Sequence, residues 1–209
     1  TTTAVNLSAS LAAAERATLL VDIDPQANAS SAYGVIAPEL HLYDALVGDR
    51  VILEITCPTE LSHLHLAPSG PDLVGAEIEL VTMEDRESRM RRALEPVVHA
   101  YDYIVIDCPP SLGLLTLNAL TAAGPDAGEI IVESTTNGAA GMFYELVQSA
   151  KRGEGDLKLH FFPWHAHKSY KRPPSKNFDP TPQDKWEKRL REAGCNDQQI
   201  SWWRWKSTD

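Results

Sequence analysis

Two stretches of this sequence decide its fold: LLVDIDPQAN at Leu19–Asn28 and YDYIVIDCPPS at Tyr101–Ser111. Each contains a short apolar, β-branched run that is typical of a parallel strand buried on both faces. Each run ends in an aspartate, Asp22 in the first and Asp107 in the second. Open α/β sheets bind their ligands at the carboxyl ends of such strands. We therefore expect an α/β fold, a mostly parallel, doubly wound sheet that presents these carboxylates at one end.

A nucleoside triphosphatase of the P-loop type needs two such carboxylates, one for the Mg²⁺ shell and one to position the attacking water. It also needs a glycine-rich loop whose backbone amides hold the phosphates. The chain opens with TTTAVNL at Thr1–Leu7, and no glycine-rich loop precedes it. The expected fold is therefore of the P-loop NTPase type without its P-loop strand, followed by an irregular helical C-terminal appendage.

Four segments carry a more specific pattern in a fixed order. They are TTTAVNL (1–7), DIDPQAN (22–28), DLVGAEIEL (72–80) and DCPPSLGLLTLNAL (107–120). Over residues 1–123 the chain resembles the ParA/MinD/Soj family of deviant Walker ATPases, which partition chromosomes and plasmids. In that family a glycine-rich loop ending in Gly-Lys runs into the Thr-Thr-Thr helix. The resemblance implies that this chain begins one residue after the P-loop lysine, and that Ala27 stands where a glycine is usual.

The resemblance also implies a role for each residue of the nucleotide site. ATP and Mg²⁺ are the expected cofactors, with Thr1, Thr2, Asp24 and Asp107 as the cofactor-binding residues. Thr1 would ligate the metal through its hydroxyl, and Asp107 would bind it through water. Asp24 would be the catalytic residue that activates or orients the hydrolytic water. The alternatives are structural: Asp24 as a turn residue that accepts a backbone N–H, and Asp107 as an ordinary strand-end aspartate.

The same family implies a ParB-type partner, non-specific DNA binding and an ATP-dependent homodimer. The lysine that reaches across the dimer belongs to the glycine-rich loop, so the resemblance implies the dimer only for a chain that has this loop. Without that loop, Asp22, Asp24 and Asp107 would repel a triphosphate. We therefore expect a protein that descends from an ATPase and that is inactive as these 209 residues.

A second resemblance begins after the first one ends. The segments that carry it are EIIVESTTNG (129–138), GMFYEL (141–146), FFPW (161–164) and CNDQQISWWRW (195–205). From about residue 128 to 209 they resemble the large terminase subunit of tailed phages, a DNA-packaging ATPase. We therefore expect two domains, a ParA-like fragment at 1–124 and a terminase-like fragment at 125–209.

Composition changes at the same place. Residues 1–124 carry 6 Lys+Arg and 17 Asp+Glu, whereas residues 125–209 carry 13 and 12. No lysine occurs before Lys151 and no tryptophan before Trp164. We interpret the chain as two joined gene fragments. The alternatives are one ordinary protein with an acidic front and an aromatic tail, a packaging-motor fragment, and a joined product without function.

Three further groups of residues have weaker interpretations. Thr135–Asn137 could couple hydrolysis to DNA movement in a terminase, although turn chemistry alone accounts for them. The histidines at positions 160, 165 and 167 lack a Cys or acidic residue at metal-ligand spacing. The tryptophans of 202–205 could stack on bases or pack against another domain.

The bulk properties limit the cellular setting. The net charge of −10 argues against tight duplex binding by the whole surface. Cys57, Cys108 and Cys195 lie far apart, which favours reduced thiols and a cytoplasmic protein. Neither a signal peptide nor an apolar run of membrane-spanning length occurs, so no membrane association is expected.

Periodicity and turn residues predict the elements. Helices are expected at 2–14, 42–47, 76–81, 87–100, 114–123, 141–151, 183–193 and 197–206, and strands at 18–22, 64–67, 104–107, 129–134 and 157–162. Residues 51–56 fit either a helix or a strand, and the proline-rich stretch 163–182 predicts an irregular arm.

Overall fold

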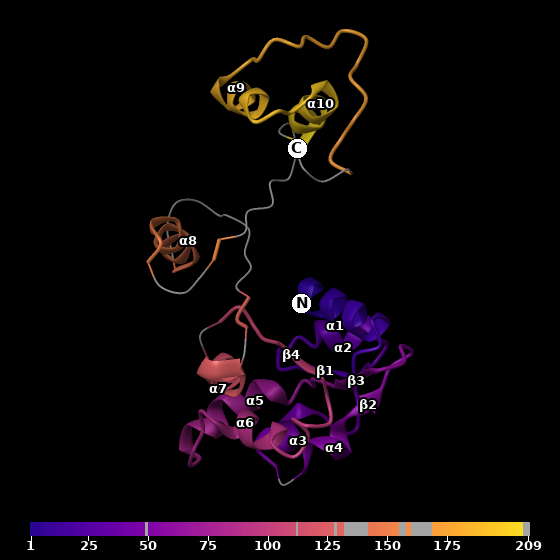
Figure 1. Cartoon of the computed structure of the whole chain (residues 1–209), viewed down its shortest axis with the longest axis vertical. Helices are drawn as coiled ribbons and strands as arrows, with labels where there is room; N and C mark the ends of the chain where they lie inside the picture. The colour runs from indigo at the N-terminus through magenta and orange to yellow at the C-terminus, as the bar shows by residue number, and fades with distance from the viewer. Residues whose placement is uncertain are drawn as a thin grey trace. The chain divides into compact units, whose positions relative to one another are not determined.

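The computed structural model describes residues 1–48, 50–111, 113–127, 129–131, 142–154, 158–159 and 169–206, with the side chains of 125–127 and 142–143 left out. It divides into two compact units, Thr1–Val132 and Glu133–Asp209. Each unit is described by itself below (Figure 1).

The first unit is a four-stranded sheet between two layers of helices. Its elements are α1 (Thr2–Ala13), β1 (Thr18–Asp22), α2 (Asn28–Ala32), α3 (Leu42–Leu46), α4 (Ile52–Ile55), β2 (Cys57–Pro58), β3 (Leu64–Ala67), α5 (Leu73–Glu79), the 3₁₀ turn η1 (Leu80–Thr82), α6 (Arg89–Leu94), β4 (Tyr103–Asp107) and α7 (Leu114–Ala127). The strand order is β2-β3-β1-β4. β1 is parallel to β3 and β4, and the short β2 is antiparallel to β3.

Alternation along β1 divides the core in two. Leu19 and Val21 pack with the helices α3 to α7 on one face of the sheet. Leu20 faces the other way and packs with Ala12 of α1 and Ala29 of α2. Figure 1 shows α1 and α2 on one side of the sheet and α3 to α7 on the other. The predicted mostly parallel, doubly wound α/β sheet is confirmed.

The two flanks of β1 differ in how they are covered. All five residues of β1 are buried, as expected for a central parallel strand. In β4 only Asp107 is fully buried, and Tyr103 is 48% exposed. Among the described residues, β1 is the one strand that pairs with β4. The outer side of β4 is therefore only partly covered.

Most predicted elements of this unit are found, with shifted ends. The ambiguous segment 51–56 is the helix α4, and the helix expected at 76–81 begins earlier, at Leu73. The helix expected at 87–100 ends at Leu94 and continues as turns. Neither α2 nor β2 was predicted, because five and two residues are too short to show a period.

Helix α7 contains a break at Gly124. Its φ of 66° and ψ of 165° are not helical, so two helical pieces meet at this residue. The first piece matches the helix predicted at 114–123. Gly124 is also the last residue of the first predicted domain, so the chain changes direction where the composition changes.

The second unit contains α8 (Met142–Arg152), α9 (Lys185–Glu192) and α10 (Asp197–Lys206). Asp184 caps α9 by accepting hydrogen bonds from the N–H groups of Trp186 and Glu187. Gly194 follows α9 with a φ of 90°, a left-handed residue typical of helix ends. The three predicted helices are confirmed within a few residues, and residues 169–182 are irregular as expected.

Two strands, predicted at 129–134 and 157–162, are absent from those of their residues that the structure describes. Residues 129–131 of the first and 158–159 of the second have no regular secondary structure. An isolated strand has no ladder partner to satisfy its backbone, so apolar pattern alone does not make it form. The rest of both segments lies outside the described residues. None of the described helices has the length and apolar character that a membrane crossing requires.

Candidate functional site

The carboxyl ends of β1 and β4 meet at one place. Asp22 and Asp107 are register partners in the parallel pairing of these strands. Their side chains are 0% and 5% exposed. Two neighbouring buried carboxylates at the end of a parallel sheet form the position at which α/β folds bind ligands. The prediction that the two strand ends lie together is confirmed.

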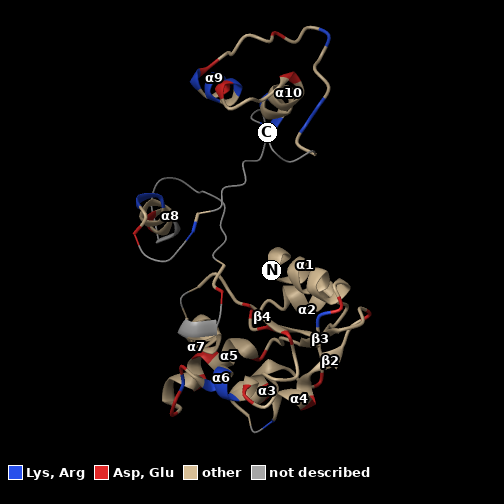
Figure 2. Cartoon of the chain, viewed as in Figure 1, with Lys and Arg blue, Asp and Glu red and all other residues tan. Residues whose placement is uncertain are grey.

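The beginning of α1 lies against Asp107. The amino nitrogen of Thr1 is 3.0 Å from Oδ1 of Asp107, and Thr1 is the N-cap of the 12-residue helix. Thr2 is the first helical residue and is exposed. A helix N-terminus carries a partial positive charge and free N–H groups, and Figure 2 shows that α1 has no charged side chain to oppose them. Thr1, Thr2 and Asp107 are thus brought to one site.

Asp24 lies in the loop after β1 and is 8% exposed. Its Oδ1 accepts the N–H of Gln26 at 3.0 Å, and its carbonyl accepts the N–H of Ala27 at 2.9 Å. The contact of Oδ1 with the Gln26 N–H is the one that the structural alternative, a turn aspartate, predicts. Ala27 has a φ of 53°, the left-handed region in which glycine is favoured, which explains why a glycine is expected there.

Asp22 is fully occupied by protein donors. It accepts the N–H and the hydroxyl of Ser30 at 2.8 and 2.7 Å, and the N–H of Asp24 at 3.2 Å. Burial raises the pKa of Asp22, against the Ser30 hydrogen bonds that lower it, and the nearby charge of Asp107 raises it further. Asp22 consequently holds α2 in place through Ser30.

Asp107 differs from Asp22 in having an unsatisfied oxygen. Its Oδ2 is buried and has no hydrogen-bond partner among the described residues. An unpaired buried carboxylate oxygen costs roughly 1–3 kcal/mol, so such atoms usually have a ligand or water. Mg²⁺ is bound in proteins by one or two carboxylates together with waters and substrate phosphates. Asp107 beside Thr1 fits that requirement.

The described residues contain no group of three or more His, Cys, Asp or Glu side chains that could hold a metal by themselves. A cation here would need ligands from a bound phosphate or water in addition to Thr1 and Asp107. Thr135–Asn137 and the histidines at 160, 165 and 167 lie outside the described residues. All three cysteines are free thiols, as expected.

Sequence reasoning missed two residues of this site, Ser30 and Ser69. Both are fully buried and both contact the β1 end: Ser30 through Asp22, and Ser69 through the carbonyl of Asp24. A signal for Ser69 was available, because it comes two residues after the end of β3. Since β3 is parallel to β1, its carboxyl end lies at the same edge of the sheet as Asp22. Ser30 offered none, since serine is common in loops and helix starts.

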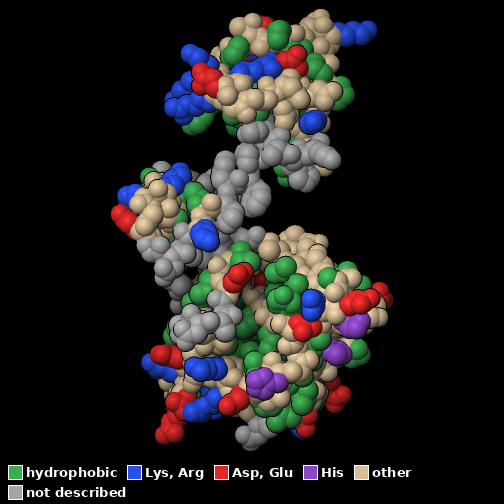
Figure 3. Space-filling view, in the orientation of Figure 1, with side chains coloured by type: hydrophobic (Ala, Val, Ile, Leu, Met, Phe, Trp, Pro, Cys, Tyr) green, Lys and Arg blue, Asp and Glu red, His purple; other side chains and the backbone are tan. Residues whose placement is uncertain are grey.

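The second unit presents a different surface. Trp186 is 52% exposed, and the cationic groups of Lys185 and Arg189 lie 5.5 and 5.2 Å from its ring centroid. Trp205 is 46% exposed and has Arg172 at 5.1 Å. Residues 169–206 carry 9 Lys+Arg and 5 Asp+Glu, and Figure 3 shows the Lys and Arg side chains on this part of the molecule. The exposed tryptophans therefore have the cationic neighbours that the sequence did not reveal.

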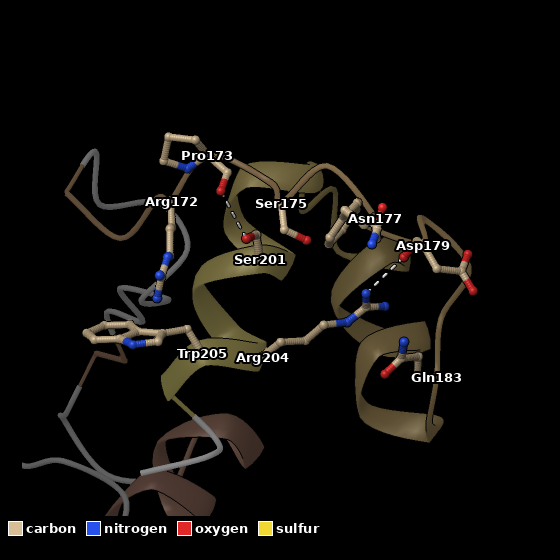
Figure 4. Close-up of a pocket in the computed structure, with 10 residues that line it drawn as sticks. Arg172, Pro173, Ser175, Asn177, Asp179, Gln183, Ser201, Arg204 and Trp205 are labelled. Atoms are coloured by element: carbon tan, nitrogen blue, oxygen red, sulfur yellow. Dashed lines mark hydrogen bonds between the residues drawn. The ribbon is translucent and has the colours of Figure 1, made fainter.

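A hollow of about 360 Å³ lies between α10 and the irregular segment before α9. Arg172 and Trp205 line it on one side, and Arg204 reaches past it to the carbonyl of Asp179 at 2.9 Å (Figure 4). Arg204 also donates to both carboxylate oxygens of the buried Glu187 at 2.7 Å. This bidentate pair joins α9 to α10, so Arg204 has a structural role.

The first unit is similar in sequence to proteins of chromosome partitioning. Residues 1–152 match the family model AAA_31, described as an AAA domain. The chain is 60% identical over 125 residues to the chromosome partitioning protein ParA of Myxococcus xanthus, covering 59% of this chain and 44% of that protein. It is 53% identical over 125 residues to the sporulation initiation inhibitor protein Soj of Bacillus subtilis, covering 59% and 49%. The chain thus spans about half the length of these relatives.

Solved structures show the same fold. Cobyrinic acid a,c-diamide synthase from Mycobacterium smegmatis, with bound ATP analogue and magnesium, superposes with a TM-score of 0.61 and 33% identity over 72% of this chain and 61% of that one. A plasmid partition protein from Borrelia burgdorferi gives a TM-score of 0.52 and 26% identity over 58% and 55%. The P-loop NTPase type of the predicted α/β fold is confirmed.

Proposed function

Because the chain belongs to the AAA_31 family of AAA domains, we propose that it derives from an ATPase of chromosome or plasmid partitioning and binds ATP with Mg²⁺ when its phosphate-binding loop is present. Over about 125 N-terminal residues the sequence is of the ParA/Soj type. The observation that carries the proposal is the meeting of Thr1, at the start of α1, with Asp107, whose Oδ2 has no partner among the described residues.

This proposal gives a role to each residue of the site. Thr1 and Asp107 would hold the Mg²⁺, and the N–H groups at the positive end of α1 would bind the phosphates. The bound metal would neutralise charge on the transferred phosphoryl group. Asp24 orients the attacking water with a carboxylate that its own turn holds in place. The structural neighbour with bound ATP analogue and magnesium supports the choice of cofactor.

The cationic group that the described residues bring to this site, the amino group of Thr1, is already paired with Asp107. No lysine precedes Lys151, and the described site contains the carboxylates of Asp22, Asp24 and Asp107. A glycine-rich loop supplies consecutive backbone N–H groups and a lysine to the phosphates. We therefore propose that these residues by themselves neither bind nor hydrolyse ATP measurably.

Calorimetry with Mg²⁺-ATP tests both statements. The 209-residue chain should give no heat of binding, and submicromolar affinity would contradict the argument. A version extended before Thr1 by a strand and a Lys-Gly-Gly-Val-Gly-Lys loop should bind Mg²⁺-ATP. In that version Asp24→Ala should retain binding and lose hydrolysis. Asp102→Ala is the matched control, because Asp102 is exposed at the other end of β4, where it accepts the N–H of Ala17.

The partners follow from the same family. We propose a cytoplasmic protein that acts with a ParB-type partner and non-specific DNA, as partition ATPases do. The cross-dimer lysine belongs to the glycine-rich loop, so the 209-residue chain should remain a monomer in the presence of ATP. Size-exclusion chromatography of the short and extended versions, each with Mg²⁺-ATP, tests this: a dimer of the short chain would contradict it.

A second candidate concerns residues 125–209, for which we propose descent from a DNA-packaging terminase subunit. It rests on the terminase-like segments of 129–205, and the change in charge and tryptophan content after residue 124 supports a separate origin for this part. The neighbouring genes separate the candidates. A ParB-like gene would favour partitioning, whereas portal and small-terminase genes would favour packaging. Neither set would favour a joined product without function.

A further inference from the structure

The loop that carries Asp24 is held by a closed ring of hydrogen bonds. Asp24 donates its backbone N–H to Oδ1 of Asp22 at 3.2 Å. Ser30 donates its hydroxyl to Oδ2 of Asp22 at 2.7 Å. Ser69 donates its N–H to the Ser30 hydroxyl oxygen at 3.0 Å, and its own hydroxyl to the carbonyl of Asp24 at 2.6 Å. The four residues thus return to their starting point.

The members of the ring come from distant parts of the sequence. Asp22 ends β1, Ser30 lies in α2, and Ser69 follows β3. The ring therefore ties the Asp24 loop both to the helix after it and to the neighbouring strand. Ser30, Ser69 and Asp22 are each 0% exposed and Asp24 is 8% exposed, so water cannot readily replace a lost partner.

The direction of each hydrogen bond is fixed by the groups present. The carbonyl of Asp24 has no hydrogen, so Ser69 must donate its single hydroxyl hydrogen to it. Ser30 then receives the Ser69 N–H and uses its own hydroxyl hydrogen for the Asp22 carboxylate. Asp22 thus accepts twice and Ser69 donates twice, and this fixed assignment of donors and acceptors holds the four residues in one arrangement.

We propose that Ser30 and Ser69 are positioning residues that set where the Asp24 carboxylate lies. That the Asp24 carboxylate orients water is part of the proposed function. The inference rests on the proposed function only where it predicts an effect on catalysis. The placement itself concerns the 209-residue chain without nucleotide. It is therefore measurable whether or not the protein is an ATPase.

Amide hydrogen exchange followed by NMR tests the placement. The variants are Ser69→Ala and Ser30→Ala in the full chain. The readout is the exchange rate at the N–H groups of Asp24 and of Gln26, which donates to the Asp24 carboxylate at 3.0 Å, divided by the rate at Leu20 in the core of β1. Loss of a buried hydrogen bond that leaves its partner unsatisfied should raise that ratio about tenfold or more. Uniform destabilisation would speed Leu20 equally and leave the ratio unchanged.

Ser8→Ala is the matched control. Ser8 is also 0% exposed, and its hydroxyl donates to the carbonyl of Ala4 at 2.8 Å within α1, outside the ring. Its ratio should stay within about twofold of that of the unmodified chain. Ratios that are unchanged in both ring variants, or raised equally in the Ser8 variant, would overturn the proposal. The calorimetric test of ATP binding is separate, so failure there would leave this result standing.

Discussion

Asp22 and Asp107 occupy the same register position on adjacent parallel strands, yet both oxygens of Asp22 accept hydrogen bonds, whereas Asp107 is paired through Oδ1 alone. Asp22 accepts three donors, whereas Oδ2 of Asp107 accepts none among the described residues. The difference arises from α2, which places Ser30 over the end of β1, whereas the described residues bring only the Thr1 amino group to Oδ1 of Asp107 and no donor to its Oδ2. One carboxylate is therefore committed to structure, and its neighbour remains available for a ligand.

The first prediction concerns the titration of Asp22. Burial raises its folded-state pKa above the ordinary value of 3.8. The stability that protonated Asp22 contributes is therefore fully present below about pH 3.8 and is lost as the pH rises through the folded-state pKa. The carboxyl ¹³C shift of Asp22 should titrate above 3.8. In Ser30→Ala the pKa should rise further, since the lost hydrogen bond favoured the charged form; a midpoint at or below 3.8 would contradict this.

The second prediction concerns Gly70, which lies against the buried ring of His41. A Cβ at position 70 would be 2.4 Å from Cδ2 of that ring. Gly70→Ala should therefore cost roughly 1–3 kcal/mol in the free energy of unfolding, as overpacking does. Gly75→Ala is the control within the same unit. Its Cβ would meet Glu79 at 3.4 Å in α5, so a gain of about 0.5–1 kcal/mol is expected from helix propensity. Urea unfolding measures both.

The third prediction concerns the pair of Glu187 and Arg204. Glu187 is 3% exposed, and the Arg204 hydrogen bonds hold its pKa below 4.5. Breaking the pair with Arg204→Met should destabilise the second unit by on the order of 2 kcal/mol, because it leaves a buried charge unpaired. The stabilisation by Glu187 is present above pH 4.5 and is lost as the pH falls through its lowered folded-state pKa.

A matched control exists for that variant. Arg152 and Glu154 make the same bidentate contact at 2.8 Å, but both are exposed. Arg152→Met should leave the unfolding of the second unit unchanged within error. An equal effect of the two substitutions would show that burial is not the cause.

The fourth prediction uses the distribution of the fluorophores. All five tryptophans lie after residue 132, whereas four of the six tyrosines lie before it. If the two units are independent, urea transitions followed by tryptophan fluorescence and by far-ultraviolet circular dichroism should not coincide. Gly70→Ala should shift the dichroism transition and leave the fluorescence transition in place. Coincident transitions in both proteins would indicate one cooperative unit and contradict the joining of two fragments.

The fifth prediction concerns DNA. Lys168, Lys171, Arg172 and Lys176 are the Lys and Arg residues of the proline-rich stretch 163–182, and we expect weak duplex binding that falls steeply as salt rises. Replacing Lys171 and Lys176 by glutamine should reduce the slope of log affinity against log salt concentration by about 2, roughly one for each phosphate contact removed. Fluorescence anisotropy measures this. Micromolar binding that persists at about 0.2 M salt would instead favour the packaging origin.

The sequence was sufficient to predict that Asp22 and Asp107 lie together. Each follows an apolar run, and the carboxyl ends of parallel strands lie at the same edge of the sheet. It was also sufficient for the helices whose period extends over two turns or more, such as α1 and α10. It could not reveal the ring around Asp24, because Ser30 and Ser69 are 39 positions apart and meet only after β1 and β3 pair. The strand predicted at 129–134 was wrong at 129–131, where an apolar run lacks a ladder partner.

Among the described residues β4 is the last strand of the sheet, and this has a consequence for handling the protein. A strand at the end of a sheet presents backbone N–H and C=O groups that can pair with another chain, and apolar residues make such pairing persistent. Ile104–Ile106 are apolar and only half-buried, and Tyr103 is exposed beside them. Aggregation on concentration or heating should therefore begin at this strand, and it should yield intermolecular β-structure, visible as a low-frequency amide I band.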